Sequence, residues 1–265
     1  MMHGPLDQGA NSAANPAKSA TPLKTRSPQV NITRREFAIG TGTLALTGAA
    51  VLAGFTTLGW PQPALAQDPS PAELMKAGPL GEMILGDEKA PVTIIEYASM
   101  TCPHCAHFHE TVYPDLKKRY IDTGKVRFIF REFPLDQLAA AGFMVARCSS
   151  QDVKSALPGL EVAKVSAQRY YAMIETLFAQ QKTWVVQRPL QPLLNIGKQA
   201  GLTETTFNEC LKNQQVLDGI EDVRTRGAQK LGVNSTPTFF INGKKFSGGM
   251  TIEDIEKQIE PYLKG

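Results

Sequence analysis

The sequence predicts an α/β fold in which a strand–helix–strand unit and a later strand hairpin are separated by a block of helices. β-Branched and aromatic residues fill two runs, 92–97 and 126–133, as in buried strands. Asn242-Gly243 stands between two further apolar runs and is typical of a two-residue hairpin turn. Residues from about 135 to 231 show helical rather than strand patterns.

The strands of the first half follow from local signals. Residues 83–85 are a short apolar run, and residues 87–91 form a turn before the buried strand at 92–97. Residues 126–133 alternate apolar and basic side chains, which indicates a second long strand.

The segment between these strands is predicted to be one helix that begins at Pro103 and ends at Gly124. Its apolar positions recur every four residues, which places them on one helical face: Phe108, Val112, Leu116 and Tyr120.

Five segments of the middle block are helical candidates, separated by proline and glycine. They are residues 138–149, 167–180, 190–200, 203–213 and 216–231. The aromatic residues of this block are expected to be core: Tyr170, Tyr171, Phe178 and Trp184.

The last part returns to strands. Residues 238–241 and 244–246 flank the Asn-Gly turn, and Thr251 with Asp254 three residues later caps a final helix.

These signals divide the chain into a leader, a lead-in and two interleaved domains. The predicted ranges are 1–66 for the leader, 67–82 for the lead-in, 83–134 with 232–265 for the α/β domain, and 135–231 for the inserted helical domain.

The leader has the pattern of an export signal. Arg34 and Arg35 precede a mildly apolar stretch, 38–60, and the tripeptide Ala64-Leu65-Ala66 suits signal cleavage. Adjacent arginines in this position resemble a bacterial twin-arginine signal. The alternative is an uncleaved membrane anchor, because about 20 apolar residues are long enough to span a bilayer. The expected location is therefore the periplasm, with membrane anchoring if the leader stays attached.

Charge and cysteine content narrow the class of function. The leader carries five basic and two acidic residues, so it accounts for the whole net charge of +3. The remaining 23 basic and 23 acidic residues balance, which gives no sign of a nucleic-acid surface. All four cysteines follow the leader, as suits two pairs in a compartment where disulfides persist.

The motif Cys102-Pro103-His104-Cys105 carries the chemistry. It follows the strand at 92–97 and opens a helix, so Cys102 meets unpaired backbone N–H groups and the positive end of the helix dipole. Both stabilise a thiolate, and His104 can add charge or a hydrogen bond. A low-pKa thiol beside a second thiol, Cys105, predicts thiol–disulfide exchange.

A zinc or copper site is the alternative from another class. His104, His107 and His109 all lie near the cysteines, and Cys105 and His109 share a helical face. Pro103 and the preceding buried strand favour redox chemistry, and no metal is expected. His107 and His109 are interpreted as the polar face of the helix.

The segment 96–105 resembles the active site of the DsbA family of periplasmic thiol–disulfide oxidoreductases, and residues 233–238 resemble its second motif. The resemblance implies a thioredoxin-like fold with an inserted helical domain. It also implies that Pro237 is a cis-proline facing the cysteines and that Thr236 presents its backbone to substrate. Glu96 would then move protons beneath the cysteines; the alternative is a half-exposed glutamate.

Thr236 differs from the valine of many oxidases in that family and resembles isomerases and reductases, so the direction of reaction stays open. The short segment before the first strand favours a monomeric oxidase over a dimeric isomerase. The expected partners are reduced or unfolded exported proteins and a membrane quinone-linked reoxidase, with no organic cofactor.

Cys148 and Cys210 are 62 positions apart and lack the spacing of a redox pair. They are expected to form a structural disulfide between two helices of the inserted domain; the alternative is two buried thiols.

Overall fold

The computed structural model describes residues 69–150 and 160–264. The leader, its Arg34-Arg35 pair and its cleavage tripeptide lie outside the described residues. Within the described part, no helix has the length and apolarity needed to cross a membrane.

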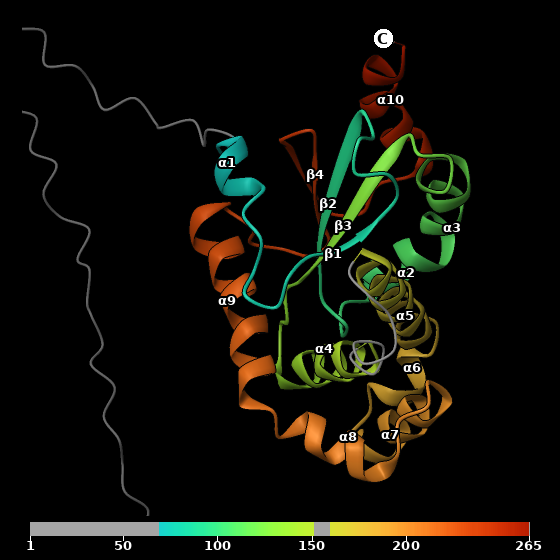
Figure 1. The fold of residues 1–265 in the computed structure, drawn as a ribbon, viewed down its shortest axis with the longest axis vertical. Coiled ribbons are helices and arrows are strands. Elements are labelled where there is room, and N and C mark those ends of the chain that lie inside the picture. The colour runs from blue at the N-terminus through green and yellow to red at the C-terminus, as the bar shows by residue number, and fades with distance from the viewer. Residues whose placement is uncertain (1–68, 151–159, 265) are drawn as a thin grey trace, which may run out of the picture. The chain divides into compact units, whose positions relative to one another are not determined.

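A five-stranded mixed sheet forms the centre of the fold (Figure 1). The strand order is β1-β3-β2-β4-β5; only the central pair β2 and β3 is parallel, and the other neighbours are antiparallel. The bounds are β1 Met83–Leu85, β2 Val92–Ala98, β3 Val126–Glu132, β4 Thr238–Ile241 and β5 Lys244–Ser247. This is the α/β fold that the sequence predicted.

Strand β2 is buried on both faces, and its alternation supplies two cores. Ile94 and Ala98 pack in the larger core with the helices that follow the strand, whereas Ile95 and Tyr97 pack in a smaller core on the opposite face. Glu96 points to the same side as Ile94, toward the larger core, because side chains two positions apart share a face.

The predicted helix from Pro103 to Gly124 is interrupted. It consists of α2 (Pro103–Thr111), α3 (Tyr113–Leu116) and a π-helical turn η1 (Lys117–Ile121). Pro114 has no N–H to bond to Glu110, and its ring would clash with that carbonyl, so the helix breaks at Val112, where φ is −112°. Gly124 still ends the segment, with a φ of +73°.

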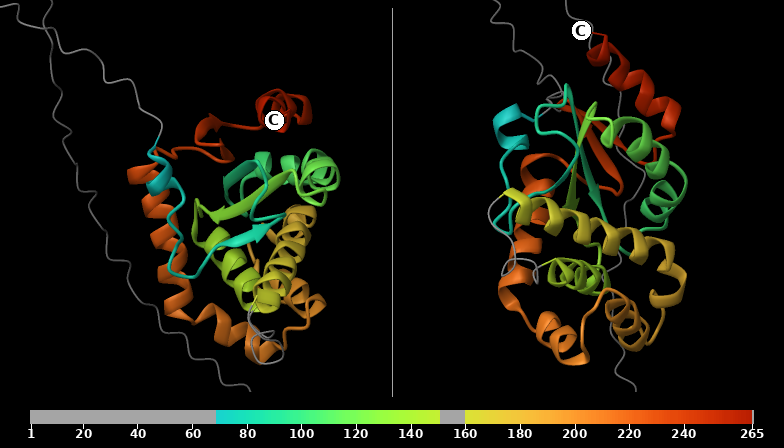
Figure 2. Two further views of the ribbon diagram at one scale, coloured as in Figure 1. Left: turned by 45° about the horizontal axis from the view of Figure 1, so that its top comes forward. Right: turned by 45° about the vertical axis from the view of Figure 1, so that its right-hand side comes forward.

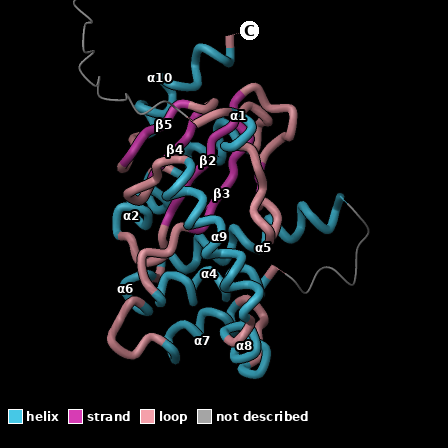
Figure 3. The backbone as a smooth tube through the Cα atoms, turned by 90° about the vertical axis from the view of Figure 1, so that its left-hand side faces the viewer, coloured by secondary structure: helices cyan, strands magenta, loops and turns pink. Residues whose placement is uncertain are grey.

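In the described part of the chain between β3 and β4 there are six helices, and most gather at one end of the sheet (Figures 1 and 3). Their bounds are α4 Gln137–Ser149, α5 Leu160–Ala179, α6 Gln181–Trp184, α7 Leu190–Gln199, α8 Glu204–Leu211 and α9 Gln214–Lys230. Helix α5 begins earlier than the predicted residue 167, and α6 was not predicted. The four aromatic residues expected in the core are fully buried.

The inserted helices share the core of the sheet. Helix α5 contacts β1 and α2, while α9 returns along the other face to β3 (Figure 2). In α9, Gly227 lies so close to Tyr97 that an added Cβ would meet its ring at 2.8 Å, so glycine permits this contact.

A buried ion pair joins α4 to the end of β3. Arg147 Nε lies 2.6 Å from Glu132 Oε1, which also accepts a 2.8 Å hydrogen bond from Tyr170. The same guanidinium donates to the carbonyls of Leu80 and Gly81. Arg147 holds the pKa of Glu132 below its ordinary value against the opposing effect of burial.

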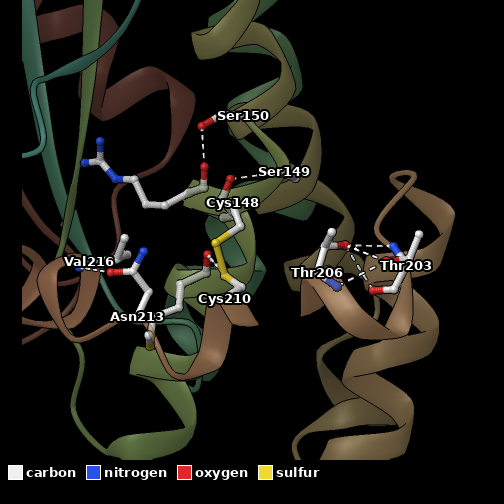
Figure 4. Close-up of a disulfide and its surroundings, with 11 residues drawn as sticks. Cys148, Ser149, Ser150, Thr203, Thr206, Cys210, Asn213 and Val216 are labelled. Atoms are coloured by element: carbon white, nitrogen blue, oxygen red, sulfur yellow. Dashed lines mark hydrogen bonds between the residues drawn. A yellow bond between two sulfur atoms is a disulfide. The ribbon is translucent and has the colours of Figure 1, made fainter. Parts of the chain in front are cut away.

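Cys148 of α4 and Cys210 of α8 form a disulfide, with Cα atoms 6.1 Å apart (Figure 4). The bond ties together two helices of the inserted block that are far apart in sequence.

The last strands and the last helix form as the sequence predicted. Asn242 and Gly243, with φ values of +44° and +94°, turn the β4–β5 hairpin, and Asn242 Oδ1 accepts a 2.7 Å hydrogen bond from the Thr93 amide. Thr251 and Asp254 form the capping box of α10 (Ile252–Leu263). The short helix α1 (Pro71–Leu74) precedes the first strand.

Candidate active site

The two free cysteines lie at the point where β2 gives way to α2. Cys102 is the N-cap of α2 and Pro103 its first residue, where a missing N–H costs nothing and the fixed φ suits the helix. The Cys102 amide donates to the carbonyl of Ser99 at 3.1 Å, which closes the turn between strand and helix. This geometry aims the first amides of the helix at the sulfur of Cys102.

The pKa of the Cys102 thiol is lowered to about 5. The main cause is a hydrogen bond from the side chain of Cys105; the Thr236 side chain and the backbone amides of Cys105 and His104 add to it, while burial opposes it. At neutral pH the reduced form therefore holds a thiolate at Cys102.

Cys105 has the opposite behaviour. It is fully buried, and burial is the main reason that its pKa is raised well above the ordinary value. The charges of Glu96 and Cys102 raise it further. The pair therefore consists of one stable thiolate and one stable thiol.

The Thr236–Pro237 peptide bond is cis and faces this pair. The Cys102 sulfur lies 3.3 Å from the Thr236 carbonyl oxygen, 134 positions away in sequence. Pro237 is buried, whereas Thr236 is half-buried and leads directly into β4. The loop thus brings a backbone edge to the reactive sulfur.

Glu96 is fully buried, so it is not the half-exposed glutamate weighed as the alternative, and its charge is close enough to Cys105 to raise the pKa of that thiol. Its Oε2 atom is 2.9 Å from Nε2 of His109. On the neighbouring strands its register partners are Phe130 and Phe239, which leave this carboxylate in apolar surroundings.

His109 corrects the prediction that it belongs to the polar face of the helix. It is 5% exposed and packs among the rings of Phe108, Tyr113, Phe130 and Phe178, while His107 is exposed. The four-residue spacing from buried Cys105 could have indicated this, because both residues share one helical face.

His104 is also exposed, and its backbone amide is the part that stabilises Cys102. Among residues 69–150 and 160–264, no three His, Cys, Asp or Glu side chains are grouped as they would be to hold a metal ion.

Two contacts around the redox turn were not predicted. Gln181 of α6 donates from Nε2 to the carbonyls of Met100 and Cys102, at 2.8 and 3.0 Å. Thr101 donates to Asp136 at 2.8 Å, and Asp136 also caps α4. No local sequence signal marks Gln181, because its partners lie about 80 positions away, at separations of 81 and 79.

Comparisons with known proteins agree with this geometry. The family model described as Thioredoxin matches residues 80–261. A solved structure, α-DsbA1 from Wolbachia pipientis, is 30% identical and superposes with a TM-score of 0.63 over 74% of this chain and 96% of that one.

Among curated proteins, a relative from Rickettsia conorii bears the name "Putative protein-disulfide oxidoreductase". It is 30% identical over 187 residues, which are 69% of this chain and 61% of the relative, so the chain spans less than two thirds of that protein. Disulfide bond formation protein D from Bacillus subtilis is 27% identical over 189 residues, 70% of this chain and 78% of that protein.

Proposed function

The chain belongs to the thioredoxin-like DsbA family of protein-disulfide oxidoreductases, and on that premise we propose that it is an exported dithiol oxidase. Its Cys102–Cys105 disulfide would pass to reduced proteins arriving in the periplasm. The observation that carries the proposal is the asymmetry of the two thiols, a Cys102 pKa lowered to about 5 beside a Cys105 pKa raised far above its ordinary value.

This asymmetry favours oxidation of the substrate. A stabilised Cys102 thiolate makes the reduced enzyme the lower-energy product and makes Cys102 a good leaving group. A substrate thiolate attacks the Cys102 sulfur, the Cys102–Cys105 bond breaks, and its electron pair goes to Cys105, which takes up one proton. A second substrate thiolate then attacks the substrate sulfur of the mixed disulfide and releases Cys102 as a thiolate.

Substrate would bind along the cis-proline loop. The Thr236 carbonyl lies beside Cys102, and an extended peptide can pair with an exposed backbone edge through main-chain hydrogen bonds. Such pairing is independent of side chains, which suits a broad set of unfolded proteins. Glu96, a buried carboxyl whose charge acts on Cys105, is the group we assign to proton exchange with that thiol.

The remaining parts of the proposal concern location and partners. The Arg34-Arg35 leader would direct export by a twin-arginine route to the periplasm. We propose a monomer that is reoxidised by a quinone-linked membrane protein, uses no diffusible organic cofactor and does not bind nucleic acid. These assignments depend on the sequence pattern and on family membership.

The first experiment is the reduction potential of Cys102–Cys105 in glutathione buffers, measured together with oxidation of a dithiol peptide. A potential near about −120 mV and rapid peptide oxidation are expected for an oxidase. A potential near about −270 mV would instead indicate a reductase or an isomerase and would overturn the proposed direction; Thr236 is then the residue to exchange. Cys102→Ser should abolish the reaction, and His107→Gln, on the exposed face of the same helix, serves as the control.

A further inference from the structure

The buried pair Glu96 and His109 extends from the cysteines toward the C-terminal end of α2, away from the solvent-exposed side of Cys102. Cys105 and His109 are both on α2, four residues apart, so His109 lies about one turn, or roughly 5 Å, farther from the Cys102 end of the helix. The side chains of His109 and Glu96 are 1% and 0% exposed. Glu96 bonds to His109 at 2.9 Å, and its charge acts on Cys105, so Cys105, Glu96 and His109 form a buried row of titratable groups.

Several polar atoms along this row have no hydrogen-bond partner among the described residues: Glu96 Oε1, His109 Nδ1 and Tyr113 Oη. Buried polar atoms in folded proteins are nearly always hydrogen bonded to protein or to water. A cluster of unpartnered polar atoms therefore calls for a functional explanation. Two of the three atoms belong to a carboxyl group and an imidazole, the side chains that proteins most often use to transfer protons.

A pocket of about 400 Å³ lies at the far end of the row. It is bordered by His109, Tyr113 and by Glu175 of α5, and it lies where α2 ends and α3 begins. Glu175 is half-buried, and burial is the main cause that raises its pKa, while the charge of His109 opposes this. The charged and titratable groups that face the row are Cys102, Glu110, Tyr113, Lys117, Lys118, Asp122, Tyr171 and Glu175.

We propose that His109 is the outer member of a proton relay, Cys105–Glu96–His109, that opens to water at this pocket and not at Cys102. The inference rests on the proposed function and adds to it the route of the proton. When the disulfide is reduced, Glu96 gives a proton to the Cys105 thiolate and regains one from His109, which is recharged by water in the pocket. Reoxidation returns one proton by the reverse path.

The position of the exit has a physical consequence. Cys102 is 5% exposed, and a substrate joined to it as a mixed disulfide would cover what remains of that opening. A relay that ends about seven residues along α2, roughly 10 Å from Cys102, keeps proton exchange open while substrate is bound. His109 is thus a positioning and proton-transferring residue, whereas the sulfur chemistry stays with the cysteines.

The test measures reduction of the oxidised protein by dithiothreitol in stopped flow, over about pH 5 to 8, with thiolate absorbance as the signal. His109→Phe keeps the aromatic packing and removes the proton carrier, and His107→Phe on the exposed face of the same helix is the matched control. The relay predicts a rate about tenfold lower or more for His109→Phe with a changed pH profile, an unaltered Cys102 pKa, and no change for the control.

A double variant makes the test sharper. If both residues act in one path, the double variant Glu96→Gln with His109→Phe is reduced no more slowly than Glu96→Gln alone. If instead the two substitutions slow reduction independently, so that their rate factors multiply, the relay is overturned. An unchanged rate and pH profile in folded His109→Phe would overturn it too. Should that variant not fold, His109→Gln keeps a hydrogen bond to Glu96 without carrying protons and must show the same slowing.

The reaction with dithiothreitol needs no protein substrate. The test of the relay is therefore separate from the test of the proposed function. The relay can be disproved while peptide oxidation is still observed, and it can be supported in a protein that proves to be a reductase.

Discussion

At the scale of single residues, the site depends on opposite environments for two sulfurs one helical turn apart. Cys102 lies at the helix start among donors, while Cys105 is buried in the core, where the charge of Glu96 acts on it. The motif alone predicted the lowered pKa of Cys102 and the nearby second thiol, because the helix start and the spacing are local properties. The pairing of Glu96 with His109 was not predicted, since a strand residue and a helix residue meet only when the helix packs on the sheet.

The lowered pKa of Cys102 predicts a pH-dependent stability of the reduced form. The folded pKa is about 5 and the ordinary value is 9.0, so between these limits the unfolded chain binds one more proton than the native one. The stabilisation by the thiolate is complete only above about pH 9 and disappears as the pH falls through about 5. The raised pKa of Cys105 has the opposite sign and reduces stability only above the ordinary thiol range.

The measurement is the free energy of unfolding of the reduced form minus that of the oxidised form between about pH 4 and 8. This difference should grow with pH by up to about 1.4 kcal/mol per unit above pH 5, and Cys102→Ser should abolish the growth. A difference independent of pH in the natural chain would contradict the lowered pKa.

At the scale of elements, the inserted helices contact the redox turn directly. Gln181 of α6 donates to two carbonyls that flank Thr101, and Asp136 at the start of α4 accepts from Thr101 itself. Helix α6 has only four residues, too few for a periodic pattern, and this is why it escaped prediction. Apart from the start of α5, the predicted boundaries of the longer helices were closer, because caps and glycines mark them.

Replacing Gln181 with alanine should lower the free energy of unfolding by about 1–2 kcal/mol, because two carbonyls near a half-buried turn lose a donor. Gln180→Ala is the matched control, since that neighbouring amide donates only to the exposed Gln199. Urea unfolding at neutral pH measures both variants. Equal effects of the two substitutions would show that the contact of α6 with the redox turn adds no stability.

At the scale of the whole molecule, one core serves both the sheet and the inserted block. Residues of β2, α2, α4, α5 and α7 pack in the same apolar cluster, and the Cys148–Cys210 disulfide fastens α4 to α8 at the edge of it. An inserted block so closely packed on the sheet should hold the redox turn in place even without this disulfide.

Removing the disulfide by Cys148→Ala with Cys210→Ala should therefore lower stability and leave the chemistry intact. By loop-closure entropy, removing a disulfide that closes a loop of 62 residues lowers the free energy of unfolding by about 4 kcal/mol. Removal of native disulfides typically costs about 2 to 5 kcal/mol. Thermal unfolding gives the loss, and the rate of reduction by dithiothreitol should stay within about twofold of the natural chain. A large fall in that rate would mean that the disulfide also shapes the redox site.

The sequence by itself determined the features that short stretches of chain encode. These are the Cys102–Cys105 pair at a helix start, the Asn242-Gly243 turn, the Thr251 cap and the order of the strands and the longer helices, because each depends on neighbours within a few residues. Only the tertiary structure decided that His109 is buried against Glu96, that Pro114 divides the first helix into separate segments, and that Gln181 reaches the redox turn. Those outcomes depend on which surfaces of the sheet and of the inserted helices are buried against each other. These contacts join residues that are far apart in sequence, so they exist only in the assembled core.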